Sequence, residues 1–167
     1  MKPPIGYQNL RKARLSEASG LYFITKSCVE RLSKNMTPAE KMRLGRLVHP
    51  KVPDIILNSL DWLQKQNLIT LLSYCLMPDH LHLLFQLGEA ANLENVMRRF
   101  GSFTGLEVYR KTGRGYLWQK GYYDRALRDE TEIEPHVIYI EQNPVRAGLV
   151  KSAEDWPWSS YQLTDLG

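Results

Sequence analysis

The strongest structural constraint in this chain is a pair of apolar runs separated by only two residues. The runs cover residues 68–77 and 80–87, and Pro78 and Asp79 lie between them. Proline fixes φ at the first corner of a turn and aspartate is a frequent turn residue, so the segment predicts two strands joined as a hairpin. One face of the second run is entirely apolar and is expected to lie on the core: Leu81, Leu83, Phe85 and Leu87.

The opposite face of the second run begins with two histidines, His80 and His82. Side chains alternate along a strand, so the two imidazoles point the same way and lie about 6–7 Å apart. Two imidazoles side by side at the end of a strand can share a metal ion. A His-x-His pattern is nevertheless short and common, and an ordinary surface histidine beside a turn histidine would also account for it.

The remaining periodicities predict a complete α+β order of elements. A strand is expected at residues 21–25, a helix at 53–66, a long helix at 92–111, a less regular strand at 116–127 and a last helix at 131–142. With the hairpin, the order is β, α, β, β, α, β, α. The first six elements give a ferredoxin-like split βαβ fold, which is an antiparallel sheet with helices on one face, and the C-terminal helix is an addition to it.

Two of these helices carry end signals. The long helix has Asn92 as its expected N-cap and an apolar stripe made of Leu93, Val96, Met97, Phe100 and Phe103. In the last helix, Thr131 and Glu134 have the spacing of a capping box, and Pro144 is expected to stop the helix.

Composition favours one domain with a proper core. The chain has 167 residues, of which 43% are hydrophobic and 24% are charged, so residues 1–167 are expected to form a single domain with an N-terminal arm at 1–20 and a tail at 151–167. The net charge of +4 is a mild basic excess that is compatible with a nucleic-acid partner.

Compartment signals point to the cytoplasm. Cys28 and Cys75 lie in apolar runs and are expected to be buried thiols of a reducing compartment. Residues 1–15 lack the apolar stretch of a signal peptide, and residues 68–77 have about half the length that spans a bilayer. A cytoplasmic, soluble protein is therefore expected.

The last helix carries the second candidate group. Tyr139 and Asn143 are four residues apart and share one face of the helix. A tyrosine on an amphipathic helix is usually a core or rim residue, and an asparagine before proline is usually a helix stop, so the pair alone is not decisive.

Four motifs occur in order along the chain, at residues 77–84, 117–128, 139–150 and 156–161. Together they resemble the REP-associated tyrosine transposases, which are relatives of the single-tyrosine insertion-sequence transposases in the HUH class of single-strand DNA endonucleases. The resemblance covers nearly the whole chain after Leu21, except that residues 29–53 match no usable part of it.

The resemblance implies roles for particular residues. His80 and His82 would be ligands of a divalent cation, Tyr139 would be the nucleophile, and Asn143 would be a third ligand, with the adjacent Gln142 as a competitor. Imidazole is a softer ligand than Mg²⁺ prefers, so the ion is expected to be Mg²⁺ or Mn²⁺, with Mn²⁺ the more active. A structural zinc site is the rival interpretation, and the lack of a nearby thiolate counts against it.

The implied activity is that of a metal-dependent, single-strand-specific DNA endonuclease and strand transferase. It would act on hairpin-forming repeat DNA through a 5′-phosphotyrosine intermediate. The alternatives are a hairpin-binding module with vestigial chemistry and a replication-initiator-like or relaxase-like HUH nickase. Hairpin or single-stranded DNA is the expected partner of a monomer or homodimer, in a bacterial cytoplasm and on the nucleoid when bound to DNA.

Basic and aromatic residues around the motifs are candidate DNA contacts. Singly, most are better explained as solvated helix faces and core aromatics, whereas the basic group as a whole is more persuasive. The candidates for phosphate contacts are Arg98, Arg99, Arg110, Lys111, Arg114, Lys120, Arg125 and Arg128, and those for base stacking are Tyr116, Trp118, Tyr122 and Tyr123.

Overall fold

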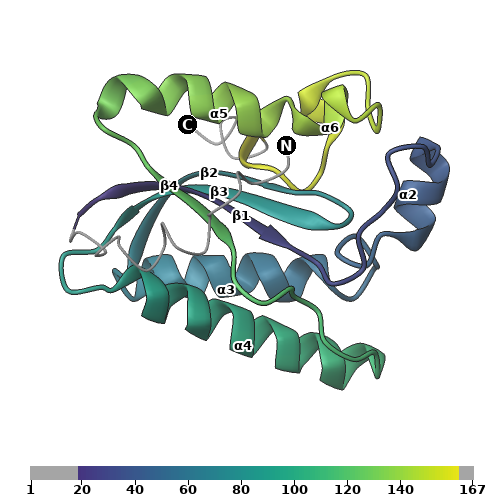
Figure 1. Ribbon diagram of the computed structural model, residues 1–167, viewed down its shortest axis with the longest axis horizontal. Helices are drawn as coiled ribbons and strands as arrows, with labels where there is room; N and C mark the ends of the chain where they lie inside the picture. Colours follow the sequence, from purple (N-terminus) through teal and green to yellow (C-terminus); the bar gives the residue numbers. More distant parts are fainter. Residues whose placement is uncertain (1–18, 162–167) are drawn as a thin grey trace.

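The computed structural model describes residues 19–161, and it places a four-stranded antiparallel sheet at the centre of the fold (Figure 1). The strand order is β2-β3-β1-β4, which is the order of a ferredoxin-like split βαβ unit and confirms the predicted fold class. The strands are β1 (Leu21–Ser27), β2 (Ile69–Leu76), β3 (His80–Leu87) and β4 (Tyr123–Ala126).

Helices cover both faces of this sheet. Figure 1 shows α3 (Pro53–Lys65) and α4 (Leu93–Thr112) below it, and α5 (Ile133–Glu141) with the short α6 (Asn143–Arg146) above it. The split βαβ unit thus has its two helices on one face, as predicted, and the C-terminal helix closes the other face. A further helix, α2 (Pro38–Leu44), lies between the first predicted strand and the first predicted helix, in a segment without a predicted element.

The predicted hairpin is formed by β2 and β3. The Met77 amide donates to the His80 carbonyl at 2.8 Å across the Pro78-Asp79 turn, and Cys75 pairs with His82 in the register. The apolar face of β3 is buried against α3 and α4 as expected: Leu81, Leu83, Phe85 and Leu87 are each at most 1% exposed.

The long helix differs from its prediction at one core position. Asn92 caps α4, as expected, with its side-chain oxygen accepting from the Asn95 amide at 3.1 Å. Phe103, however, is 54% exposed, and Thr104 and Val108 are buried in its place. A helix turns by 100° per residue, so the buried stripe that contains Phe100 continues at Thr104 and Val108, the fourth and eighth residues after it. Phe103 lies outside that stripe and faces solvent.

The last predicted helix is divided into shorter pieces. A 3₁₀ turn at Glu130–Glu132 comes first, capped by Asp129, whose carboxylate accepts from the Thr131 amide at 2.9 Å. The predicted capping box of Thr131 and Glu134 is therefore wrong. The prediction that the helix ends before Pro144 is confirmed: α5 ends at Glu141 with Gln142 as its C-cap. Pro144 lies in the first turn of the separate helix α6, where its missing N–H costs no hydrogen bond.

A second apolar cluster fills the space between the sheet and α5. It includes Phe23, Leu84 and Ile140, together with Trp156, which is 2% exposed and donates from Nε1 to the Leu76 carbonyl at 3.0 Å. The tail after α6 thus packs along the edge strand β2. β3 is consequently buried on both faces, and a histidine on its α5 side is shielded from water.

The two cysteines are buried, as predicted. Cys28 and Cys75 are both free thiols, and burial raises the pKa of the Cys75 thiol to about 12.

The predicted fourth strand, at residues 116–127, is regular only at β4, and Trp118 forms an isolated bridge with Cys28. Within residues 19–161, no helix is long and apolar enough to cross a membrane. The N-terminal arm predicted at 1–20 lies almost wholly outside the described residues.

Candidate active site

The two histidines lie side by side on the face of β3 that α5 covers. Their ring centroids are 4.7 Å apart and their ring planes are inclined by 80°. His82 is 5% exposed, whereas the His80 side chain is 18% exposed and lies at the rim. The alternation predicted from the sequence therefore brings both imidazoles together, one in the interior and one at the edge.

Each imidazole has a hydrogen-bond partner at Nδ1. His80 Nδ1 lies 2.7 Å from the Asp79 carboxylate, and His82 Nδ1 lies 2.9 Å from the Thr25 hydroxyl on the neighbouring strand β1. The Asp79 carboxylate can only accept, so it holds the proton of His80 on Nδ1 and leaves the Nε2 lone pair for another partner. Metal-binding histidines have this arrangement, in which an outer group fixes the ring and its tautomer.

The electrostatics of the pair favour a neutral interior imidazole. Burial, and then the charge that a protonated His80 would carry and the charge of Arg146, lower the pKa of His82 well below its usual value. His82 is therefore neutral at neutral pH, which is the form that can donate a lone pair to a metal ion.

Asp79 stays ionised beside His80. Burial alone would raise the pKa of Asp79, but hydrogen bonds from His80 and from the Leu32 amide, with the charge of Arg31, outweigh it and lower the pKa. The carboxylate thus anchors the loop after β1 and orients the rim histidine at the same time.

Tyr139 faces the histidines from α5. Its ring centroid lies 5.7 Å from that of His82 and 5.9 Å from that of Phe23, and Phe23 itself stacks on His82. The guanidinium carbon of Arg146 lies over the tyrosine ring, 4.2 Å from its centroid, and the same guanidinium donates to the Tyr139 carbonyl at 2.7 Å. Side chains from β1, β3, α5 and α6 therefore hold the ring of Tyr139 beside His82.

The two candidate amide ligands follow Tyr139 by one turn. Asn143 Nδ2 donates to the Tyr139 backbone carbonyl at 3.1 Å. The side-chain oxygen of Asn143 takes no part in this hydrogen bond. Gln142 ends α5 as its C-cap, and no hydrogen bond or ring contact within residues 19–161 joins its side chain to the histidines. The structure thus ties Asn143, and not Gln142, to the tyrosine.

The predicted donor set, two imidazoles and an amide, offers nitrogen and oxygen ligands of the kinds that divalent cations take in proteins. No group of three or more His, Cys, Asp or Glu side chains in the described part of the chain is arranged to hold a metal. A site here would therefore consist of the two imidazoles and an amide, with open positions for other ligands. Such an open set does not suit a closed structural zinc site, which takes four protein ligands.

The predicted DNA contacts divide into exposed and buried groups. Three of the cations form surface ion pairs: Arg110 with Glu107, Arg114 with Glu30, and Arg125 with Glu132. All eight basic candidates are exposed: Arg98, Arg99, Arg110, Lys111, Arg114, Lys120, Arg125 and Arg128.

The aromatic candidates fare differently. Tyr122 is 8% exposed and belongs to the main core, while Trp118 packs on Phe100 and donates to the Thr104 hydroxyl at 2.8 Å. The stacking role predicted for Trp118 and Tyr122 loses its support, because both rings are engaged within the fold. Tyr116, in contrast, is 90% exposed.

Sequence reasoning missed four residues of the site, namely Phe23, Thr25, Asp79 and Arg146. Asp79 was noticed only as a turn residue, although its place directly before His80 was a usable signal. Thr25 pairs with His82 across two strands distant in sequence, and that register could not be read from local patterns.

Comparison with known proteins identifies the family. Residues 31–143, the greater part of the chain, match the family model described as "Transposase IS200 like". A REP-associated tyrosine transposase of Haemophilus influenzae is 32% identical over 103 residues, covering 52% of this chain and 56% of that protein. One of Escherichia coli K12 is 28% identical over 94 residues, covering 53% and 52%.

The chain thus spans about half the length of the curated relatives it matches. A solved structure of a REP-associated tyrosine transposase bound to a REP hairpin shares the fold, with a TM-score of 0.66 and 22% identity over 90% of this chain and 81% of that one. The family match covers the strands and helices that carry both the histidines and the tyrosine, and the chain belongs to the IS200-like transposase family.

Proposed function

We propose that this protein is a metal-dependent, single-strand-specific DNA endonuclease and strand transferase that acts through a covalent 5′-phosphotyrosine. The observation that carries this proposal is the approach of Tyr139 to His82, with ring centroids 5.7 Å apart. The two residues come from elements far apart in the sequence, and each is oriented by a partner of its own, Arg146 for the tyrosine and Thr25 for the histidine.

The reaction is a transesterification at a phosphodiester. The Tyr139 hydroxyl oxygen attacks phosphorus and loses its proton, the P–O3′ bond breaks, and the departing 3′ oxygen takes up a proton. A tyrosine hydroxyl has an ordinary pKa of about 10 and is a poor nucleophile at neutral pH, so orientation and charge stabilisation must supply the rate. One phosphoester replaces another, so the reverse step can rejoin strands without an energy source.

The side chains around Tyr139 have distinct tasks in this proposal. Arg146 and Phe23 hold the ring, which limits the directions from which the hydroxyl can meet a phosphate. The guanidinium of Arg146 also places a positive charge beside the attacking group. His80 and His82, with Asn143 or its competitor Gln142, would hold a Mg²⁺ or Mn²⁺ ion. Bound there, the ion would supply Lewis-acid polarisation of the scissile phosphate.

The substrate proposal rests on the relatives. Two relatives are named as REP-associated, and one solved structure is of a REP-associated tyrosine transposase bound to a REP hairpin. We extend this to hairpin-forming repeat DNA with an unpaired flank, because an in-line attack needs an accessible and flexible backbone. Such a substrate would place the protein on the nucleoid, in the cytoplasm.

A covalent-adduct assay tests the proposal. Hairpin DNA with short single-stranded flanks, labelled at the 5′ or the 3′ end, is incubated with the protein in Mn²⁺ or EDTA and separated on a denaturing gel. The expected result is a Mn²⁺-dependent adduct that retains the 3′ label and disappears in Tyr139→Phe and His82→Ala. Tyr109→Phe is the matched control, because Tyr109 lies 55% exposed on α4 and should leave the adduct unchanged.

The other outcomes assign the alternatives. Metal-dependent cleavage without an adduct would indicate hydrolysis and remove Tyr139 from the mechanism. Tight hairpin binding without cleavage or adduct, across a set of related hairpins, would identify a binding module with vestigial chemistry. Adduct formation at the origin-like or transfer-origin-like sites of nickases, and not beside repeat hairpins, would favour an initiator-like or relaxase-like enzyme.

A further inference from the structure

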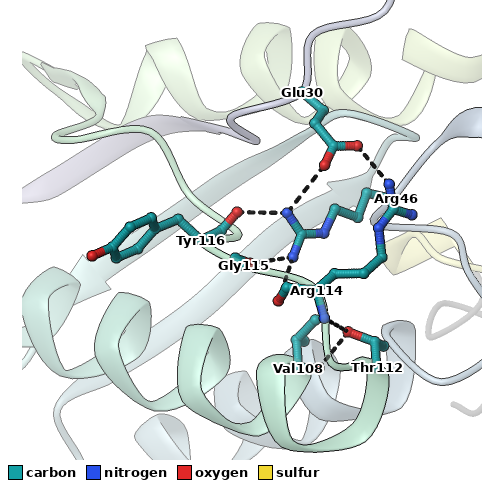
Figure 2. A network of polar contacts seen from close by, with 7 residues as sticks. All are labelled: Glu30, Arg46, Val108, Thr112, Arg114, Gly115 and Tyr116. Carbon is teal, nitrogen blue, oxygen red and sulfur yellow. Dashed lines mark hydrogen bonds and ion pairs between the residues drawn. The ribbon is translucent and has the colours of Figure 1, made fainter.

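The connection between α4 and β4 has no regular secondary structure, yet a buried arginine fixes its backbone. Arg46 is 3% exposed, and its guanidinium donates to three consecutive carbonyls, those of Arg114 at 3.0 Å, Gly115, and Tyr116 at 2.5 Å. Figure 2 shows this guanidinium within the turn, with Glu30 closing the network above it. The loop is therefore held at its backbone.

A second buried cation holds the rest of the same connection. Lys26 is 6% exposed, and its ammonium donates to the Gln119 carbonyl at 3.4 Å and to the Gly121 carbonyl at 3.0 Å. Between these two anchors, the Leu117 carbonyl accepts from the Val29 amide at 2.9 Å. In a regular strand, these carbonyls would pair with a neighbouring strand. Here the side chains of Arg46 and Lys26 bind most of them, and the amide of Val29, just after β1, binds one.

This arrangement is costly to build. Burying a charged group is unfavourable unless hydrogen bonds and counter-charges compensate it, and Arg46 Nε is a buried atom without a hydrogen-bond partner within residues 19–161. Structural compromises of this kind are expected where a fold serves function. The buried guanidinium holds one conformation of the exposed residues 113–116, which directly precede the buried Leu117.

The loop displays one large aromatic side chain to solvent. Tyr116 is 90% exposed, more than any other large hydrophobic residue in the described part of the chain, although its carbonyl is bound by Arg46. In Figure 2 its ring extends away from the Arg46 network. An exposed ring on an ordered backbone is ready to stack without a further loss of loop entropy.

One end of the loop is joined to the strands that carry the active site. Ser27 pairs with His80 in the register of β1 and β3, and the next residue, Cys28, bridges to Trp118. Neighbouring strands are about 5 Å apart, so roughly 10 Å separates the backbone of His80 from that of Trp118, two residues after Tyr116. Arg114 and Lys120, both exposed, flank Tyr116 on the same loop.

We propose that Tyr116, displayed by the loop that Arg46 holds, stacks on an unpaired base in the single-stranded part of the DNA substrate. Arg114 and Lys120 contact the neighbouring phosphates. Arg46 is a positioning residue in this scheme. The inference rests on the proposed function, since it assigns a base-binding position to the same DNA substrate.

The test measures base stacking separately from catalysis. The hairpin DNA carries 2-aminopurine at one unpaired position at a time, and binding is followed in EDTA by fluorescence quenching and by anisotropy. The wild-type protein is expected to quench one position strongly. Tyr116→Ala should abolish that quench and weaken binding roughly 5- to 100-fold, the range of a lost base–aromatic stack, while Tyr116→Trp should keep both. Tyr109→Ala, which removes another exposed tyrosine, should match the wild type.

The outcomes separate this inference from the proposed function. If Tyr116→Ala binds within twofold of the wild type and keeps the quench, the stacking role is wrong even when the wild type forms the Tyr139 adduct. An equal loss in Tyr109→Ala would also overturn it, because the effect would then not belong to the loop. A wild-type protein that binds no single-stranded or hairpin DNA would refute the proposed function together with this inference.

Discussion

Thr25→Val is the sharpest perturbation of the candidate metal site. The Thr25 hydroxyl lies 2.9 Å from His82 Nδ1, and the two residues are directly paired across β1 and β3. Valine has nearly the same shape and is also β-branched, so the strand and its packing are retained. The substitution therefore removes the hydroxyl and leaves His82 Nδ1 unpaired in an interior that is shielded from water.

The magnitude follows from the burial of His82. A buried polar group left without its partner costs about 1–3 kcal/mol. If Thr25 orients the imidazole for a metal ion, the same loss weakens metal binding by about 10- to 100-fold, as is usual for partners of metal-bound histidines. Maximal adduct formation at saturating metal should fall much less, because Tyr139 and its contacts with Phe23 and Arg146 are unchanged.

The assay is a Mn²⁺ titration of adduct formation on a fixed hairpin DNA, with urea unfolding of the metal-free protein measured in parallel. Thr25→Ser, which keeps the hydroxyl, is the control and should titrate near the wild type. A folded Thr25→Val protein whose Mn²⁺ midpoint lies within threefold of the wild type would refute the reasoning, since His82 would then need no partner at Nδ1.

Three further perturbations test separate parts of the structure. Tyr139→Phe should abolish the covalent adduct but leave hairpin binding within a few-fold by anisotropy, and a large loss of binding would contradict a purely chemical role for the hydroxyl. Asp79→Asn should lower the free energy of unfolding by about 1–3 kcal/mol at pH 7, because the ionised carboxylate accepts from His80 and the Leu32 amide. The folded-state pKa of Asp79 is lowered, so its contribution is present above the unfolded value of about 3.9 and is lost as pH falls through the folded value; urea curves of the two proteins should converge below pH 4. Trp156→Ala should destabilise the fold by about 3–5 kcal/mol in urea unfolding, since the ring is 2% exposed, and an effect below 1 kcal/mol would show that the tail is not part of the core.

Local patterns predicted the elements that depend on alternation and turn chemistry. The hairpin was readable because Pro78-Asp79 separates two apolar runs, and the period of two placed His80 and His82 on one face. The same kind of reasoning failed at Phe103, where an apolar residue fell outside the helical stripe. It failed again at the start of the last helix, where Asp129 caps a 3₁₀ turn in place of the predicted capping box of Thr131 and Glu134.

The aromatic residues between α4 and β4 show a second limit. The sequence allowed Trp118 and Tyr122 to be either core aromatics or base-stacking residues, and the structure engages both rings within the fold. Tyr116, two residues before Trp118, is 90% exposed, and its carbonyl is bound by Arg46, 70 positions away in the sequence. No local pattern contains that long-range contact.

The sequence by itself determined the order of elements, the shared face of His80 and His82, and, through four ordered motifs, the resemblance to the REP-associated transposases. These properties depend on neighbours within a few residues or on the chain order, both of which are written in the sequence. Tertiary structure alone decided that Thr25 meets His82, that Arg146 lies over Tyr139, and that Tyr139 faces the histidines. Those contacts join segments that are adjacent only after the sheet has paired and α5 has packed on it, because strand register and helix docking are set by the packing of the whole core.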